Sequence, residues 1–589
     1  GPLAALSIGE DPQAGVRATF DTSYRALGRP EQRMFRLLGL VPGADITPAA
    51  AAAIAAIAKQ EAAQLLDHLA TAHLADQVAP GRFGLHDLLA TYARECARQD
   101  QANSTAAIGR LLDWYLCHAD AAARLLYPHM LRLDVQPAAG GATASLRDDT
   151  AALEWLDAEQ RNLIAAVLWA ATNGHQQVAW LLGDTLRGYF WQSRNTVDWL
   201  ETAQAGFAAA VDVGDRRAQA AMQINLATAN RCVHRYELAI EQYAAAAELA
   251  SSSGWIEGQA GCIGNLGTIH TSMGNLRSAA DCHQEALRLF RKAGQHTGEA
   301  NALTNLGLTY QLLGQLHDAV DCQEQALELY RNIGSRGGRA HALDNLGELE
   351  HALGRLGPAE GHLSQAVALH REVGNRYAEA ETLHDLAATQ RDAGRDRQAL
   401  DTAQAGLTLA RDIGDRRVEA RMLNLLGALK LVAASPRQAI ELHRQALRLA
   451  KDSDARYPQT EALIGLAAAF GRLDHHEEAI AYAAQALAST HETSYRVLEA
   501  QAQSMLAALH LATGDHDAAL DHAKRALVIC QETGHRLGEA RALRLIGDAM
   551  SVYKGRETAR PDWQRAWAIF ADIGVPEANE LVNLLSDQG

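Results

Sequence analysis

The sequence predicts an all-α protein, a right-handed superhelix of repeated helical hairpins that follows a smaller N-terminal domain. From residue 178 to residue 577 the chain repeats every 40 residues, ten times, without an insertion or a deletion. Apolar residues within each unit recur at helical spacing, whereas residues 11–100 show a different pattern. A fixed period of this size indicates a solenoid, a class of fold that presents an extended binding surface.

The columns of the repeat show how each unit packs. When the units that begin at Ala218 and every 40 residues thereafter are aligned, the ninth column is leucine or isoleucine and the twenty-second is alanine. The tenth column is glycine or alanine throughout. Short side chains at fixed positions let two helices approach closely, so these columns predict the contact between the helices of each hairpin.

One unit, residues 298–337, illustrates the predicted hairpin. Leu303, Leu306 and Tyr310 lie on one face of a first helix, and Gly314 ends that helix. A second apolar stripe begins at Ala319 and ends before the next glycine. Each unit is therefore expected to be two helices, with no room for a strand.

HEAT repeats and propeller blades also have periods near 40 residues. Propeller blades are excluded because they need β-rich, turn-dense segments, and the small-residue columns disfavour HEAT repeats. The order Leu-Gly in the first helix and Ala-x6-Ala in the second resembles the tetratricopeptide repeat, here longer than its usual form. Residues 178–217 read as a degenerate first repeat, with Trp199 in the alanine column.

The eighth column contains an asparagine ladder. In tetratricopeptide families this column faces the concave groove, where a carboxamide can donate to and accept from the backbone of an extended peptide. The alternative is that asparagine is a consensus residue that holds helix contacts. The predicted partner-binding residues comprise this column and two flanking columns: Asn225, Asn265, Asn305, Asn345, Asp385, Asn301, His341, Thr304, Asp344, His384 and Arg421.

Composition narrows the classes of function. The net charge of −16 makes the chain a poor nucleic-acid binder, and no apolar run is long enough to span a membrane. The seven cysteines are scattered without a C-x-x-C pair, which is typical of reduced thiols in a cytoplasmic protein. We expect no metal site, no catalytic residues and no enzyme activity, because no nucleophile–base order or metal-ligand spacing stands out.

Residues 11–100 read as a small helical domain with a hairpin. Helices are predicted over 16–27, 31–40, from Thr47-Pro48 onward, over 60–74 and from 87 to about 98. Pro80-Gly81 marks a turn between two short extended segments. Helices followed by a small hairpin are the pattern of a winged helix. Direct DNA binding by this domain is disfavoured, because residues 47–75 contain one lysine, Lys59, and no arginine.

The segments EQRMFRLLGLVPGADIT, AAQLLDHLATAHL and GRFGLHDLLATYAR resemble the winged-helix module of STAND-type signalling ATPases, which have an NB-ARC nucleotide-binding core. The resemblance is strongest to actinobacterial regulators of the SARP type. It implies that His86 contacts the β-phosphate of ADP in an intact protein. The chain contains no G-x-x-x-x-G-K-[ST] motif. It is therefore expected to hold no cofactor alone, with ADP or ATP bound only by the intact protein.

We divide the chain into five parts: 1–10, a tag remnant and the end of an upstream domain; 11–100, the winged-helix domain; 101–177, a helical bridge; 178–577, the repeats; and 578–589, a C-terminal tail. The expected function is that of a regulatory fragment of a transcriptional regulator. Its partners would be a protein or peptide in the groove and an upstream NB-ARC domain, without nucleic acid or membrane. It would be a monomer alone and an oligomer in the activated intact protein. The alternative is a constitutive scaffold without a switch.

Overall fold

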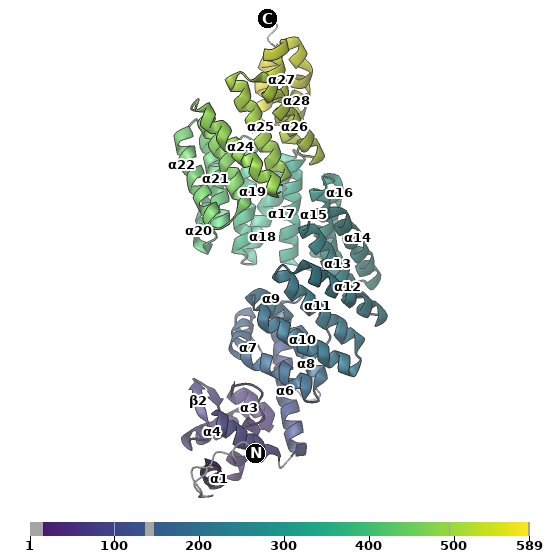
Figure 1. The fold of residues 1–589 in the computed structure, drawn as a ribbon, viewed down its shortest axis with the longest axis vertical. Coiled ribbons are helices and arrows are strands. Elements are labelled where there is room, and N and C mark those ends of the chain that lie inside the picture. Colours follow the sequence, from purple (N-terminus) through teal and green to yellow (C-terminus); the bar gives the residue numbers. More distant parts are fainter. Residues whose placement is uncertain (1–15, 99–100, 136–145, 494, 587–589) are drawn as a thin grey trace. The chain divides into compact units, whose positions relative to one another are not determined.

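The computed structural model describes residues 16–98, 101–135, 146–493 and 495–586 (Figure 1). The predicted tag remnant therefore lies outside the described residues. The chain divides into two compact units, residues 1–269 and residues 270–589, which are treated separately below. The division falls within one helix, α13 (Ile256–Ser272).

The N-terminal domain of the first unit has the predicted elements and one additional strand. Its helices and strands are α1 (Val16–Ala26), α2 (Arg29–Leu38), β1 (Asp45–Ile46), α3 (Pro48–Ala55), α4 (Lys59–Thr71), β2 (Asp76–Ala79), β3 (Arg82–Gly84) and α5 (Asp87–Ala97). Thr47 caps α3 as predicted, its side chain accepting a hydrogen bond from the Ala50 amide. The strands form an antiparallel sheet in the order β1-β3-β2. Sequence analysis missed β1, which has only two residues and no alternating pattern.

An ion-pair network joins this domain to the helices that follow it. Arg82 on β3 contacts Asp45 on β1 and Glu159 on α7, the latter with 2.8 Å between Nη1 and Oε1. Asn162, also on α7, donates to both carboxylates. The pKa of Asp45 is lowered: burial opposes the shift, but the hydrogen bonds from Arg82 and Asn162 outweigh it.

The remaining helices of the first unit form the bridge and the first repeats. They are α6 (Gln101–Leu126), α7 (Asp149–Thr172), α8 (Gln176–Thr185), α9 (Arg187–Ser193), α10 (Thr196–Val213), α11 (Arg216–Cys232), α12 (Tyr236–Ser252) and most of α13. The first helix of the degenerate repeat is split into α8 and α9 at Leu186. Trp199, which replaces the column alanine, is fully buried against this split helix.

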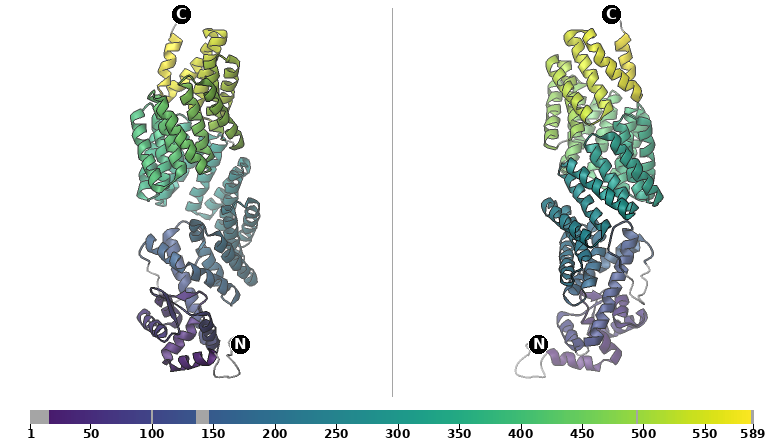
Figure 2. Two further views of the ribbon diagram at one scale, coloured as in Figure 1. Left: turned by 60° about the vertical axis from the view of Figure 1, so that its left-hand side comes forward. Right: turned by 90° about the vertical axis from the view of Figure 1, so that its right-hand side faces the viewer.

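From α15 to α28 the second unit consists of paired antiparallel helices, each pair one repeat (Figure 2). The helices are α14 (Leu276–Ala293), α15 (His296–Leu312), α16 (Leu316–Asn332), α17 (Arg336–Ala352), α18 (Leu356–Glu372), α19 (Arg376–Asp392), α20 (Asp396–Ile413), α21 (Arg416–Val432), α22 (Pro436–Asp452), α23 (Arg456–Gly471), α24 (His476–Thr493), α25 (Arg496–Thr513), α26 (His516–Glu532), α27 (Arg536–Lys554), α28 (Arg556–Ile573) and α29 (Glu577–Ser586). Residues predicted to be a tail form α29, whose Leu581 is fully buried.

The small-residue columns occupy the helix contacts as predicted. Every alanine of the twenty-second column is at most 2% exposed. At Gly347 in the tenth column, a Cβ atom would lie 2.4 Å from Cγ of Leu363 on the partner helix. Because such a contact is shorter than carbon atoms allow, the hairpin depends on the missing side chain.

The second unit also closes on itself through contacts between early and late repeats, which we call the closure seam. The turn at Gly314 lies against the Glu532 carbonyl, and the turn at Gly354 lies against Ile573. A hydrophobic cluster joins Leu356 on α18 to Trp563 and Phe570 on α28. Residues more than 200 positions apart therefore meet, which a repeat that contacts only its neighbours would not produce.

Candidate functional site

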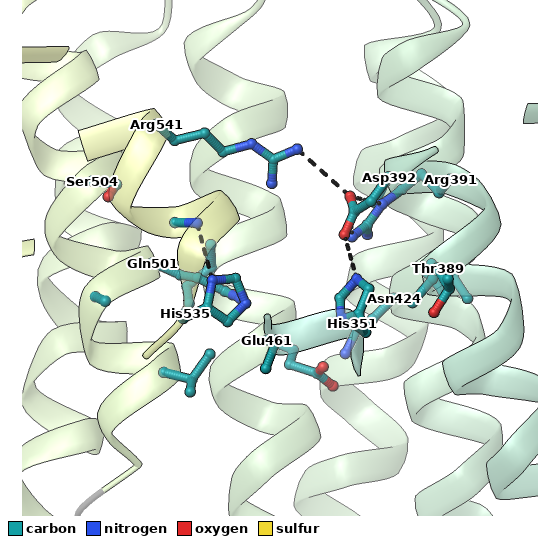
Figure 3. A pocket seen from close by; sticks show the side chains of 18 of the residues that line it. His351, Thr389, Arg391, Asp392, Asn424, Glu461, Gln501, Ser504, His535 and Arg541 are labelled. Carbon is teal, nitrogen blue, oxygen red and sulfur yellow. Dashed lines mark hydrogen bonds and ion pairs between the residues drawn. The ribbon is translucent and has the colours of Figure 1, made fainter. Parts of the chain in front are cut away.

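The candidate site is a cavity of about 880 Å³ within the second unit (Figure 3). Its wall is formed mainly by the first helices of successive repeats, α17, α19, α21, α23, α25 and α27. The lining side chains come mostly from columns four, seven, eight, eleven and fourteen of the repeat. Columns four, seven, eleven and fourteen are spaced three or four residues apart, and column eight adjoins column seven, so all five share one face of a helix. The strict 40-residue period keeps that face inward in each repeat.

Arg421 on α21 is the centre of a charged layer in this cavity. Its Nη2 atom lies 3.2 Å from Asp385 Oδ1, and its Nη1 atom lies 3.5 Å from Glu381 Oε1. The Tyr457 ring lies 5.8 Å from the guanidinium carbon, within cation–π distance. Burial lowers the pKa of Arg421, but the charges of Asp385, Glu461 and Glu381 outweigh burial and raise it, so the guanidinium remains charged.

The carboxylates around Arg421 respond differently to it. Burial would raise the pKa of Asp385, but the charge of Arg421 and a hydrogen bond with His384 hold that pKa below its usual value. Glu348 has no comparable partner, and burial together with the charge of Asp385 raises its pKa to about 7. Burial also raises the pKa of Asp344, with Asp385 and Glu348 adding to the shift. The layer therefore contains more carboxyl groups than Arg421 can keep ionised.

The other end of the cavity is a closed ion-pair network. Asp392 on α19 accepts from Arg391 at 2.9 Å, lies 3.0 Å from His351 Nε2 and lies 3.6 Å from Arg541 Nη2. Arg541 on α27 also pairs with Glu577 at 2.7 Å. Figure 3 shows Arg541 reaching across to Asp392. These charges lower the pKa of Asp392 well below its usual value, although burial opposes that shift.

Three of the predicted binding residues line the cavity: His384, Asp385 and Arg421. Asp344 lies behind them, with one carboxylate oxygen buried and without a hydrogen-bond partner among the described residues. The structure thus brings together the later members of the predicted columns. The asparagines of the predicted ladder are not among the residues that line this cavity.

The other predicted residues lie outside the cavity lining. Asn305 and Asn345 are half-buried on α15 and α17. Asn301 accepts a hydrogen bond of 2.6 Å from Tyr330, and Thr304 donates to the Ala300 carbonyl. His341 packs against the His370 ring, with 5.1 Å between the ring centroids.

In the first unit, the amide of Asn265 donates to the Gly261 carbonyl of its own helix. Asn225 requires a correction, because it is fully buried. It accepts from Trp199 Nε1 at 3.0 Å and donates to Asp184 and to the Ala221 carbonyl, each at 3.0 Å. Asn225 is hydrogen-bonded to Trp199 of the degenerate repeat, so its side chain holds helices together and is not accessible to a partner.

Sequence analysis missed Glu348, His351, Asp392 and Arg541. Glu348 and His351 occupy columns eleven and fourteen, on the same helix face as columns four, seven and eight, so extending the helical periodicity would have found them. Arg541 is in column four itself. Asp392 had no such signal, because its role depends on the closure seam.

His86 lies at the N-cap position of α5, exposed, and its side chain makes no capping hydrogen bond. Its role toward ADP stays a prediction. Within the parts of the chain described here, no group of three His, Cys, Asp or Glu side chains is arranged to hold a metal ion. Those same parts contain no helix with the length and apolar character of a membrane span.

Comparisons with known proteins agree with the repeat architecture. A family model described as tetratricopeptide repeat matches residues 260–332, 338–412 and 498–560. "Regulatory protein AfsR" of Streptomyces coelicolor (strain ATCC BAA-471 / A3(2) / M145) is 32% identical over 253 residues, 41% of this chain. A protein of the same description from Streptomyces griseus is 38% identical over 178 residues, 29% of this chain. The matches span only 26% and 18% of those proteins' own lengths.

Among solved structures, a Rap protein complexed with Competence and Sporulation Factor aligns with a TM-score of 0.47 and 12% identity. That alignment covers 61% of this chain and 99% of the Rap chain. The chain is thus a protein with tetratricopeptide repeats that is similar, over part of its length, to AfsR regulators.

Proposed function

We propose that this chain is the ligand-receiving part of a signalling regulator and that the second unit binds a peptide or a protein segment in its cavity. The observation that carries the proposal is the cavity itself, about 880 Å³ in volume and lined by both charged and apolar residues of successive repeats. That volume is typical of ligand sites in proteins. Similarity to AfsR regulators supports a regulatory role.

The switch in this proposal involves the N-terminal domain. His86 would contact the ADP of an NB-ARC core in the intact polypeptide, where an imidazole can donate to phosphate oxygens. Occupation of the cavity would then shift this domain and release the nucleotide contact. The resemblance to SARP-type regulators and the exposure of His86 support this part of the proposal.

The experiment is selection of binders from a random peptide library displayed on phage, with the purified chain as bait. A matched pair of variants locates the binding. Ala428→Trp fills the cavity from α21, whereas Ala405→Trp adds the same side chain on the exposed face of α20. Selected peptides are expected to bind the wild type and the Ala405→Trp variant but not the Ala428→Trp variant. All three proteins should have the same melting temperature. Peptides that bind all three equally would place the binding site elsewhere.

A further inference from the structure

Two carboxylates of the cavity lack ion-pair partners. Asp385, Asp392, Glu577 and Glu580 each pair with an arginine, but Glu348 and Glu461 form no ion pair with any residue that the structure describes. Glu348 accepts a hydrogen bond from Gln311 Nε2 at 3.5 Å, which is at the limit of a hydrogen bond. The Oε2 atom of Glu461 is buried and has no hydrogen-bond partner among the described residues.

Buried polar atoms in folded proteins are rarely left without a partner, so the Glu461 oxygen requires an explanation. Figure 3 shows the Glu461 carboxylate among the side chains that line the cavity. A donor supplied from within the cavity would satisfy this oxygen. Glu348 lines the same cavity.

The charge balance of this wall identifies the kind of donor. Around Arg421, five carboxylates face two guanidinium groups: Asp344, Glu348, Glu381, Asp385 and Glu461 against Arg417 and Arg421. Arg417 is already paired with Glu381 at 2.8 Å, and Arg421 with Asp385 at 3.2 Å. A further cation would therefore favour the ionised form of the remaining carboxyl groups, whereas an anion would disfavour it.

The shape of the site favours an organic cation over an inorganic ion. The cavity is far larger than a single ion requires, and Ala388, Ala428, Ala468, Leu425 and Met505 give it an apolar surface beside the charges. The Tyr457 ring provides a further surface for a guanidinium or an ammonium.

We infer that Glu348 and Glu461 bind an ammonium or guanidinium group of a peptide that enters the cavity. This inference rests on the proposed function and specifies the class of ligand. A lysine or arginine side chain, or the amino terminus of the peptide, has the required charge. Its apolar stem would lie on the alanine and leucine surface while its head forms charge-assisted hydrogen bonds with the two carboxylates.

The test uses the same peptide selection, followed by calorimetry on the whole chain. Peptides selected by the wild type are expected to be enriched in Lys or Arg. The double variant Glu348→Gln/Glu461→Gln should bind them about 10- to 100-fold more weakly, since two charged acceptors become neutral. The matched control is Glu328→Gln/Glu441→Gln, which removes the same charge from exposed positions on α16 and α22.

A complementary measurement does not depend on the folding of any variant. The Lys or Arg of the best peptide is replaced by Gln and the new peptide is tested on the wild type, where a similar loss of affinity is expected. Two results would overturn this inference and leave the proposed function standing. One is that peptides without a cationic group bind in the cavity, and the other is that the Gln substitutions do not change peptide affinity. The proposed function itself would be overturned if the selection yields no peptide whose binding is abolished by Ala428→Trp.

Spermidine, a small polyamine with the same charged groups, forms the last arm of the experiment. Spermidine is expected to bind at least tenfold more weakly than the peptides, because it makes no backbone contacts. Equal affinity for spermidine and peptide, lost in the Gln double variant, would show a polyamine site and overturn the peptide assignment.

Discussion

At the scale of single residues, the same repeat column performs different tasks in different repeats. Asn225 is buried and fully hydrogen-bonded, Asp385 pairs with Arg421 in the cavity, and Asn345 is half-buried. A column of identical or similar residues therefore does not imply a shared function. What each member does depends on the side chains that the neighbouring helices bring to it.

Asn225→Ala is expected to destabilise the chain. The change leaves the buried Trp199 Nε1 group and the Asp184 carboxylate each without one partner, which costs about 2 kcal/mol or more in the free energy of unfolding. Asn345→Ala, a half-buried member of the same column, should change it by about 0.5 kcal/mol or less. Denaturant unfolding of both variants measures the difference, and equal losses would contradict the structural role of Asn225.

Binding of a basic peptide in the cavity is expected to strengthen as pH rises from 6 to 8. Glu348, with its pKa raised to about 7, is largely protonated at the lower pH and ionised at the higher pH. The charged groups that face it are Asp385 and Glu381 on α19, Arg421 on α21 and, from its own helix, Asp344. Because an ionised carboxylate attracts the cation, affinity should rise by up to about tenfold per pH unit below the pKa.

The unliganded chain should show the opposite trend in stability. A carboxyl group whose folded-state pKa is raised stabilises the fold below its unfolded-state pKa, and this contribution is lost as pH rises through about 7. Glu348→Gln should reduce the pH dependence of peptide affinity, measured by calorimetry, and the pH dependence of stability, measured by thermal melts. A peptide affinity that keeps its pH dependence in Glu348→Gln would assign the effect to another group, such as a cavity histidine.

At the scale of elements, the closure seam converts a row of hairpins into a wall around a cavity. The seam combines glycine turns, at Gly314 and Gly354, with the ion pair between Asp392 and Arg541. Asp392 is the buried partner of this pair, so removing Arg541 would leave the charge of Asp392 less well compensated.

Gly314→Ala is expected to open the seam, whereas Gly334→Ala is its matched control. Both glycines adopt left-handed backbone angles, with φ of +77° and +72°, so both substitutions introduce similar backbone strain. A Cβ at Gly314 would lie 2.0 Å from the Glu532 carbonyl oxygen, while nothing lies within 4 Å of one at Gly334. Hydrogen exchange should therefore accelerate at the end of α26 and the start of α27 in Gly314→Ala alone. Equal exchange in the two variants would contradict the seam.

At the scale of the whole molecule, the chain combines two units with different kinds of chemistry. The first unit contains the small domain with its three-stranded sheet, and the second contains the charged cavity. The proposed division of labour assigns the contact with nucleotide to the first unit and recognition of a peptide to the second.

The isolated chain is expected to show no ATPase activity and no tight binding of ADP, because the sequence contributes one candidate phosphate contact, His86, and no P-loop motif. Calorimetry with ADP tests this, and micromolar affinity would contradict it. In an intact protein with an NB-ARC core, His86→Ala should weaken ADP retention and raise basal activity.

The sequence by itself determined the local architecture. The 40-residue period, the alanine and glycine columns and the Thr47-Pro48 start of α3 predicted the helical hairpins and their contacts, because these depend on neighbours in the chain. It also predicted that His384, Asp385 and Arg421 share an inward helix face, and these three residues line the cavity. Tertiary structure alone decided that Asn225 is buried and that Asp392 meets Arg541. Those outcomes depend on contacts between residues about 26 to 150 positions apart, and a repeat that resembles its neighbours does not specify which distant repeat it will touch.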